Sequence, residues 1–148
     1  MNIIICDDRI DDRKNLSDLL SDYGEKKNYE FAITEYDSGE QLCEEQSALE
    51  ACQILFLDIN MQGMDGLKTA MRIKEKYPKL PVVLVTAYMN YALDGYKVKA
   101  SRFLLKDKCV PRSPAASRVH ANSISAVSSP QPKEDASSFP SVFSGFKI

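Results

Sequence analysis

The fold is decided by one short stretch, Ile54-Leu55-Phe56-Leu57-Asp58, in which four apolar residues run directly into a carboxylate. A continuous apolar run of this length is typical of a strand that is buried on both faces of a parallel sheet. Comparable runs occupy Ile3–Cys6, Pro81–Val85 and Phe103–Leu105, and a loosely alternating segment occupies Tyr29–Tyr36. The sequence therefore predicts five strands.

Segments with helical periodicity separate these strands. Helices are predicted from Leu16 to Gly24, from Ser38 to Leu49, from Asp65 to the residue before Pro78, and from Tyr88 to Tyr96. Gly24 is expected to end the first helix, and Ser38 and Gln41 have capping-box spacing at the start of the second. Because strands and helices alternate, the chain is predicted to form an α/β fold, an open doubly wound sheet of parallel strands.

Composition divides the chain of 148 residues at about residue 107. Residues 1–107 carry a net charge of −5, whereas residues 108–148 carry +3 and hold ten of the fifteen serines and five of the seven prolines. We therefore expect one folded domain over 1–107 and a Ser/Pro-rich tail over 108–148 that is disordered or translated from a shifted reading frame. The pattern contains no fifth helix, so one edge of the sheet is expected to remain uncovered, which favours self-association.

Composition also excludes several classes of protein. The overall net charge of −2 does not suit a strongly basic nucleic-acid binder. The first apolar run, Ile3–Cys6, is too short for a signal peptide, and no stretch approaches the ~20 apolar residues of a membrane span, so we expect a cytoplasmic protein without membrane contact. The only histidine, His120, lies in the tail, which excludes histidine-based catalysis in the folded part. The four cysteines have no metal or redox spacing and are interpreted as reduced thiols.

Reactive polar residues follow the predicted strands at their carboxyl ends. They are Asp7, Asp8, Asp58, Thr86 and Lys106. In an open parallel sheet, ligands bind outside this edge, so these residues are expected to lie together. Three neighbouring carboxylates need a cation, and their hard oxygen ligands suit Mg²⁺.

This combination suits the transfer of a phosphoryl group to a carboxylate. An aspartate beside Mg²⁺ can attack phosphorus and form an aspartyl phosphate, and Asp58 is the better candidate because Asp7 and Asp8 form a pair. Thr86 and Lys106 would stabilise the phosphoryl oxygens. Each residue alone has a simpler interpretation, such as an acidic helix start or a surface charge. The occurrence of all five residues at strand ends favours the functional interpretation.

These residues belong to longer motifs that resemble a response-regulator receiver domain of two-component systems, a domain with a flavodoxin-like fold. The motifs are Asp7-Asp8 after the first strand, Leu57–Gly66, Thr86-Ala87 and Phe103–Lys106, and the resemblance covers about residues 1–106.

The resemblance implies a role for each site residue. Asp58 would be the phosphoacceptor, and the Mg²⁺ ligands would be Asp7, Asp8, Asp58 and the main-chain carbonyl of Asn60. Lys106 would be the partner of the acyl phosphate, and Thr86 with Phe103 would form a switch pair.

The resemblance also implies partners and a biological role. A sensor histidine kinase would donate the phosphoryl group, and the domain would assist its own phosphoryl transfer and hydrolysis without being an enzyme. Tyr91–Tyr96 resembles regulators with a LytTR-type DNA-binding domain, which implies regulation of transcription. No output domain is recognised in this chain, so contact with DNA is expected only through such a domain in the full regulator.

Two departures and two competing hypotheses accompany this resemblance. Gln62 and Asp107 stand where the family commonly has Pro, and Gln62 is interpreted as a change in loop rigidity without chemical consequence.

A phosphatase of the haloacid dehalogenase type would also place an aspartate such as Asp58 after an apolar strand. Such an enzyme needs a second acid two residues later, where this chain has Asn60. The other hypothesis is a fragment that interacts with partners but has lost its output.

Overall fold

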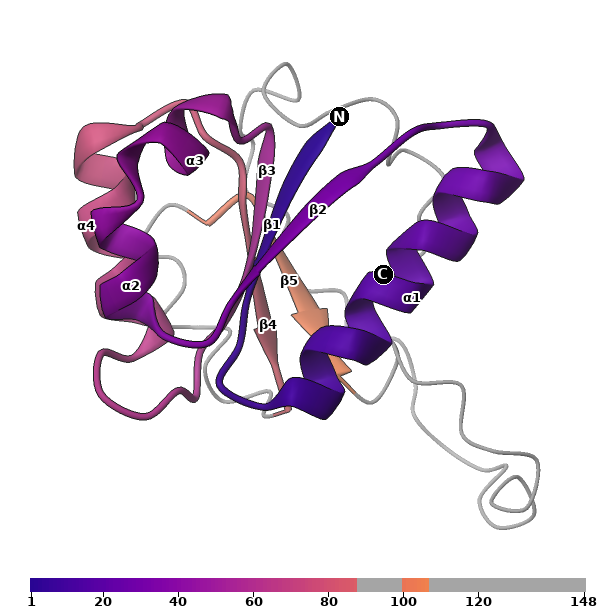
Figure 1. Ribbon diagram of the computed structural model, residues 1–148. Coiled ribbons are helices and arrows are strands. Elements are labelled where there is room, and N and C mark those ends of the chain that lie inside the picture. Colours follow the sequence, from indigo (N-terminus) through magenta and orange to yellow (C-terminus); the bar gives the residue numbers. More distant parts are fainter. Residues whose placement is uncertain (88–99, 107–148) are drawn as a thin grey trace, which may run out of the picture.

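The computed structural model describes residues 1–87 and 100–106, in which the strands form one parallel sheet (Figure 1). Its strands are β1 (Asn2–Cys6), β2 (Ala32–Tyr36), β3 (Ile54–Asp58), β4 (Val82–Thr86) and β5 (Arg102–Leu105). Their spatial order is β2-β1-β3-β4-β5, which confirms the predicted doubly wound sheet. From β1 the chain first adds β2 on one side and then crosses back to add β3, β4 and β5 on the other side. Ligands bind where the strand order reverses in this way, so a crevice for ligands is expected between β1 and β3.

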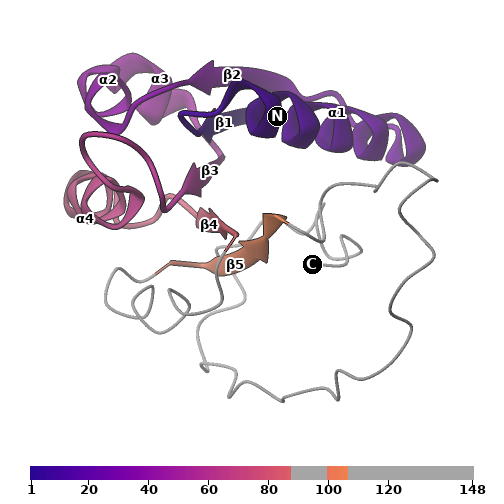
Figure 2. The same cartoon turned by 90° about the horizontal axis from the view of Figure 1, so that it is seen from below.

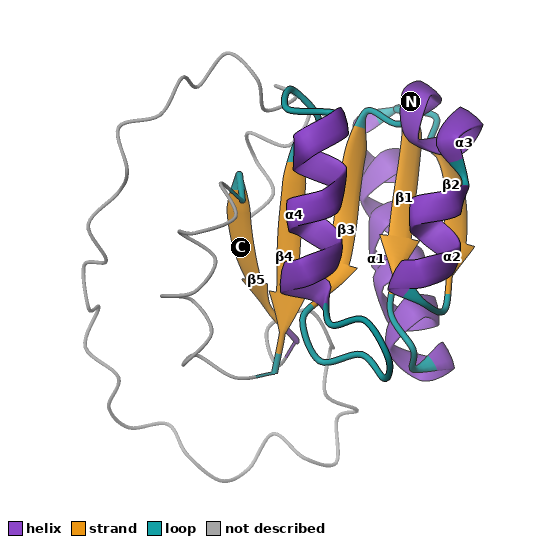
Figure 3. Ribbon diagram, turned by 90° about the vertical axis from the view of Figure 1, so that its left-hand side faces the viewer, coloured by secondary structure: helices purple, strands orange, loops and turns teal. Residues whose placement is uncertain are grey.

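Helices cover the two faces of the sheet unequally. The described helices are α1 (Ile10–Lys27), α2 (Gly39–Glu44), α3 (Gln46–Ala51) and α4 (Gly66–Lys76). Figure 2 shows α1 on one face, and Figure 3 shows α2 and α4 on the opposite face, in front of the strands.

Two apolar layers, one on each face of the sheet, form the core. On the α1 face, Leu16 and Leu20 pack with Ile3, Ile5 and Phe56. The other layer joins residues of α2 and α4 to the opposite faces of β1, β3 and β4. Every residue of β3 and β4 is buried, which explains why Ile54–Leu57 and Val82–Val85 are continuously apolar rather than alternating. Each of these apolar side chains contributes about 1.5–3 kcal/mol of burial free energy.

The first helix extends further than its sequence predicts. Gly24 was expected to end it, but α1 continues to Lys27 and is capped by Asn28 in the left-handed conformation, with φ of 58°. Gly24 instead permits close packing, because a Cβ atom there would lie 2.8 Å from the carbonyl oxygen of Tyr29. The glycine is thus required by its close approach to Tyr29, which directly follows the Asn28 cap, and not as the left-handed residue that ends the helix.

The second predicted helix is divided in two. The Ser38 cap is confirmed, since its hydroxyl accepts a hydrogen bond from the N–H of Gln41 at 3.3 Å. The helix then breaks at Glu45, whose φ and ψ of −83° and 67° are not helical, so Leu42 and Leu49 lie on separate helices. The next helix agrees with its prediction: Asp65 caps α4 by accepting from the N–H of Lys68 at 2.8 Å.

Some predictions lie outside the described residues. They concern the helix at Tyr88–Tyr96, the domain boundary near residue 107, the missing fifth helix and the tail over 108–148. These stay predictions. In the described part of the chain, no helix has the length and hydropathy needed to cross a membrane.

Candidate functional site

The sheet brings the predicted site residues to one edge. Strand register places Cys6 beside Leu57, so Asp7 and Asp8 follow β1 where Asp58 ends β3. In the same way Thr86 ends β4 beside Leu105, and Lys106 follows β5. The expectation that topology gathers these residues is therefore confirmed, although they are far apart in the sequence.

Three carboxyl groups converge at this edge. Asp7, Asp8 and Asp58 each offer a carboxylate oxygen, and these oxygens all lie within 4.8 Å of one another. Asp7 and Asp58 are buried, with exposed fractions of 5% and 2%. Among the described residues, Asp8 Oδ1 and Asp58 Oδ1 are buried without a hydrogen-bond partner. A buried carboxylate oxygen without a partner is costly, and a hard divalent cation coordinated by oxygen would satisfy both atoms. The residues therefore fit the predicted Mg²⁺.

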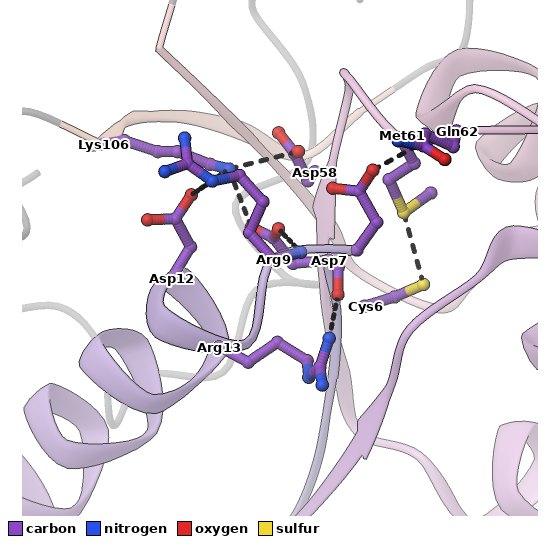
Figure 4. A network of polar contacts seen from close by, with 10 residues as sticks. Cys6, Asp7, Arg9, Asp12, Arg13, Asp58, Met61, Gln62 and Lys106 are labelled. Atoms are coloured by element: carbon purple, nitrogen blue, oxygen red, sulfur yellow. Dashed lines mark hydrogen bonds and ion pairs between the residues drawn. The ribbon is translucent and has the colours of Figure 1, made fainter.

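One ammonium group lies among these carboxylates (Figure 4). Lys106 Nζ lies 2.8 Å from Asp7 Oδ2 and 3.1 Å from Asp58 Oδ2. It also lies 2.8 Å from Asp12 Oδ2, a contact that joins the residue after β5 to α1. Because the side chain of Lys106 is only 15% exposed, these contacts are weakly screened by water. The lysine therefore sits where it can neutralise charge on Asp58 or on a group attached to it.

The site shifts the pKa values of its own members. Burial raises the pKa of Asp7, and so does the charge of Asp58, while hydrogen bonds from Lys106 and from the N–H of Arg9 act in the opposite direction. Burial alone would lower the pKa of Lys106, but hydrogen bonds to Asp12 and Asp7 outweigh it and raise the pKa above its usual value. Lys106 is therefore protonated at neutral pH.

The first turn of α1 contributes contacts that the sequence did not assign to the site. Asp12 holds Lys106, and Arg13 donates a hydrogen bond to the main-chain oxygen of Asp7 at 2.5 Å. The N–H of Arg9 donates to Asp7 Oδ1 at 2.9 Å. The sequence indicates that Asp11 and Asp12 are acids at a helix start, near enough to the site to influence it electrostatically. The direct contact between Asp12 and Lys106 was not predicted.

The loop between β3 and α4, residues 59–65, is held by two carboxylates. The N–H of Gln62 donates to Asp8 Oδ2 at 3.0 Å, and the N–H of Met64 donates to Glu40 Oε1 at 2.6 Å. Neither contact was expected from the sequence, because each joins segments that are distant along the chain.

Gly66 allows the end of this loop to pass close to the site. Its N–H donates to the carbonyl oxygen of Ile59 at 3.0 Å. A Cβ atom at Gly66 would lie 2.0 Å from the carbonyl oxygen of Asp58, so no larger residue fits without moving the backbone. The glycine thereby fixes how closely α4 approaches the end of β3.

The remaining predicted residues lie near this edge. Thr86 is 1% exposed. Phe103 is half-buried, pairs in register with Leu84 and packs against the apolar layer that includes residues of α4. Asn60 is exposed in the loop directly after β3. The switch role of Thr86 and Phe103 and the ligand role of the Asn60 carbonyl stay predictions.

Comparison with known proteins identifies related sequences. Residues 3–112 match the family described as response regulator receiver domain. The chain is 32% identical over 106 residues to the positive alginate biosynthesis regulatory protein of Pseudomonas aeruginosa, an alignment that covers 72% of this chain and 41% of the relative. It is 31% identical over 106 residues to the sensory transduction protein LytT of Bacillus subtilis, with coverage of 72% and 42%. The chain thus spans about two fifths of the length of these relatives.

Solved structures show the same fold. The response regulator protein TrrA from Thermotoga maritima, determined in complex with Mg²⁺-BeF, has a TM-score of 0.61 and 26% identity, and the match covers 70% of this chain and 84% of that chain. The N-terminal domain of a response regulator/sensory box/GGDEF 3-domain protein from Carboxydothermus hydrogenoformans has a TM-score of 0.60 and 28% identity, with coverage of 72% and 82%.

Proposed function

The chain belongs to the response regulator receiver domain family of two-component systems, and from this membership we propose that it is a phosphorylation-dependent switch whose phosphoacceptor is Asp58. One observation carries the proposal. Asp58 is buried at the end of β3 with Oδ2 at 3.1 Å from the Lys106 ammonium, while Oδ1 has no partner among the described residues. One oxygen of the carboxylate is therefore held by a positive charge, and the other is available for reaction.

In the proposed reaction, an oxygen of Asp58 attacks the phosphorus of a phosphoryl donor. A bond forms between this oxygen and phosphorus, and the bond from phosphorus to the leaving group breaks. The Lys106 ammonium then balances charge on the phosphoryl oxygens, and the hydroxyl of Thr86 donates a further hydrogen bond to them. The same groups would assist the later hydrolysis of the acyl phosphate, so the domain acts on itself and not on a separate substrate.

Asp7, Asp8, Asp58 and the main-chain carbonyl of Asn60 would hold Mg²⁺. When bound, this ion supplies positive charge that offsets the carboxylates and the equatorial phosphoryl oxygens. The cluster of three carboxylates and the unpartnered oxygens of Asp8 and Asp58 support this assignment.

The phosphoryl donor is proposed to be a sensor histidine kinase in the cytoplasm. The residues that match the receiver family, 3–112, contain no histidine, so a phosphohistidine donor lies outside the receiver domain. The relatives are more than twice as long as the matched region, and their names describe a regulatory protein of alginate biosynthesis and a sensory transduction protein. We therefore propose that the full regulator controls transcription through an output domain, and that DNA contact belongs to that domain.

A phosphorylation assay tests the role of Asp58. The full chain, incubated with Mg²⁺ and acetyl phosphate, should gain about one phosphoryl group by intact-protein mass spectrometry, whereas Asp58→Asn should gain none. Asp22→Asn is the matched control, because Asp22 is an exposed acid on α1. Labelling of the Asp58→Asn variant, or no labelling of the folded wild-type chain, would contradict the proposal. Sustained turnover of phosphate esters would favour the phosphatase hypothesis instead.

A further inference from the structure

The carboxylate of Asp8 is divided between two environments. Oδ2 accepts a hydrogen bond from the main-chain N–H of Gln62 at 3.0 Å. Oδ1 is buried and has no partner in the described part of the chain. Asp58 shows the same division, with Oδ2 held by Lys106 at 3.1 Å and Oδ1 unpartnered. In both residues one oxygen is fixed by the protein and the other is left for a ligand.

Asp7 differs, because both of its oxygens are already engaged. Oδ1 accepts from the N–H of Arg9 at 2.9 Å, and Oδ2 contacts Lys106 Nζ at 2.8 Å. A bound cation would therefore gain the most binding free energy at the unpartnered oxygens of Asp8 and Asp58. Of these two carboxylates, Asp58 is oriented by a charged side chain and Asp8 by the Gln62 N–H.

We propose that the main-chain N–H of Gln62 is a positioning group for cation binding, which turns Asp8 so that Oδ1 faces the cation. Hydrogen bonds from outer groups to metal-ligating carboxylates typically change metal affinity 10- to 100-fold when they are lost. This inference rests on the proposed function only in that the cation site is the same one. It gives Gln62 a chemical role, where the sequence suggested only a change in loop rigidity.

The contact depends on which residue occupies position 62. Proline has no N–H, so the hydrogen bond to Asp8 cannot form in a chain with Pro at this position. The side chain of Gln62 is exposed and the bond to Asp8 uses only the backbone. Any residue except proline therefore preserves the donor, and this supplies a matched pair of variants.

The test measures Mg²⁺ binding by calorimetry in the absence of a phosphodonor, using the full chain. Gln62→Pro removes the N–H and is expected to weaken Mg²⁺ binding by about 10-fold. Gln62→Ala keeps the N–H and is expected to bind within about twofold of the wild type. Equal weakening in both variants, or unchanged binding in Gln62→Pro, would overturn the proposal.

A measurement on the wild-type chain covers the case in which Gln62→Pro fails to fold. The Gln62 amide proton should be protected from hydrogen exchange both without and with Mg²⁺, because the N–H stays on Asp8 Oδ2 while Oδ1 faces the cation. Loss of protection when Mg²⁺ is added would show that the cation displaces the N–H, and the positioning role would be wrong.

Phosphorylation separates this inference from the proposed function. At saturating Mg²⁺, Gln62→Pro should reach the same phosphoryl uptake as the wild type, but its half-maximal Mg²⁺ concentration should be about 10-fold higher. A chain that binds Mg²⁺ with the expected difference between variants but takes up no phosphoryl group refutes the proposed function alone. Uptake with identical Mg²⁺ midpoints refutes the positioning role alone.

Discussion

At the scale of single residues, Lys106 offsets part of the negative charge of the site. Its ammonium contacts three carboxylates, those of Asp7, Asp12 and Asp58, and its side chain is largely buried. Without the ammonium, these groups would face one another in a poorly hydrated space. The free energy of the cation-free fold therefore depends on this one positive charge.

Replacing the lysine should be costly for stability. Lys106→Ala is expected to lower the free energy of unfolding by about 3 kcal/mol in the absence of divalent cations, because it leaves buried carboxylates unpaired. Lys68→Ala is the control: Lys68 also forms an ion pair, 3.4 Å from Asp65, but its side chain is 72% exposed. The control should lose about 0.5 kcal/mol or less. Urea denaturation measures both, and similar losses in the two variants would contradict the charge-balancing role of Lys106.

The residues of the site differ in how far the sequence could predict them. Asp58 and Lys106 were placed correctly because each follows an apolar strand, and parallel strands end at a common edge. The contacts of Asp12 and Gln62 were missed, since they depend on the position of a side chain or an N–H relative to a segment far along the chain. Patterns of hydrophobicity carry no information about such contacts.

At the scale of elements, the start of α4 is set by its approach to β3. The helix begins at Gly66, where a Cβ atom would lie 2.0 Å from the carbonyl oxygen of Asp58. This backbone contact determines where the loop of residues 59–65 ends and how α4 lies against the sheet.

A single added methyl group tests this packing. Gly66→Ala is expected to destabilise the fold by about 2 kcal/mol, because overpacking against the backbone outweighs the better helix propensity of alanine. Met71→Ala in the same helix is the control, since Met71 is 50% exposed. Thermal or urea unfolding should show a clear loss only for Gly66→Ala. If both variants are equally stable, the close approach to Asp58 is not a constraint on α4.

The helices also show why boundaries were harder to predict than the elements themselves. The existence of α1 follows from its apolar periodicity, but its end depends on the contact between Gly24 and Tyr29 and on Asn28. Likewise, the cap at Ser38 was predictable from local sequence, whereas the break at Glu45 was not. The local sequence predicts well where a helix begins when a side chain caps that end. The other boundaries are not marked by such a cap.

At the scale of the whole molecule, the acidic edge links stability to cation binding. Three carboxylates with oxygens within 4.8 Å repel one another, and a bound cation removes this repulsion only in the folded chain. Ligand binding to the folded state raises the free energy of unfolding in proportion to the logarithm of ligand concentration.

This coupling predicts opposite effects of one substitution. At tenfold its dissociation constant, Mg²⁺ should stabilise the wild-type chain by about 1.4 kcal/mol. Asp8→Asn should remove most of this gain, yet stabilise the cation-free chain by about 1 kcal/mol because it removes one of the like charges. Urea denaturation with Mg²⁺, with chelator and with NaCl at matched ionic strength distinguishes specific binding from screening. A variant that is less stable than wild type without Mg²⁺ would contradict the repulsion.

The contact between Lys106 and Asp12 joins residues 94 positions apart. During synthesis on a ribosome, β1, α1 and β3 emerge long before β5, so an unfinished chain holds its carboxylates without the ammonium that completes the site. The complete site should therefore form only after β5 has paired with β4. A chain that stops before β5 should therefore lack the ion pairs that Lys106 forms with Asp7, Asp12 and Asp58.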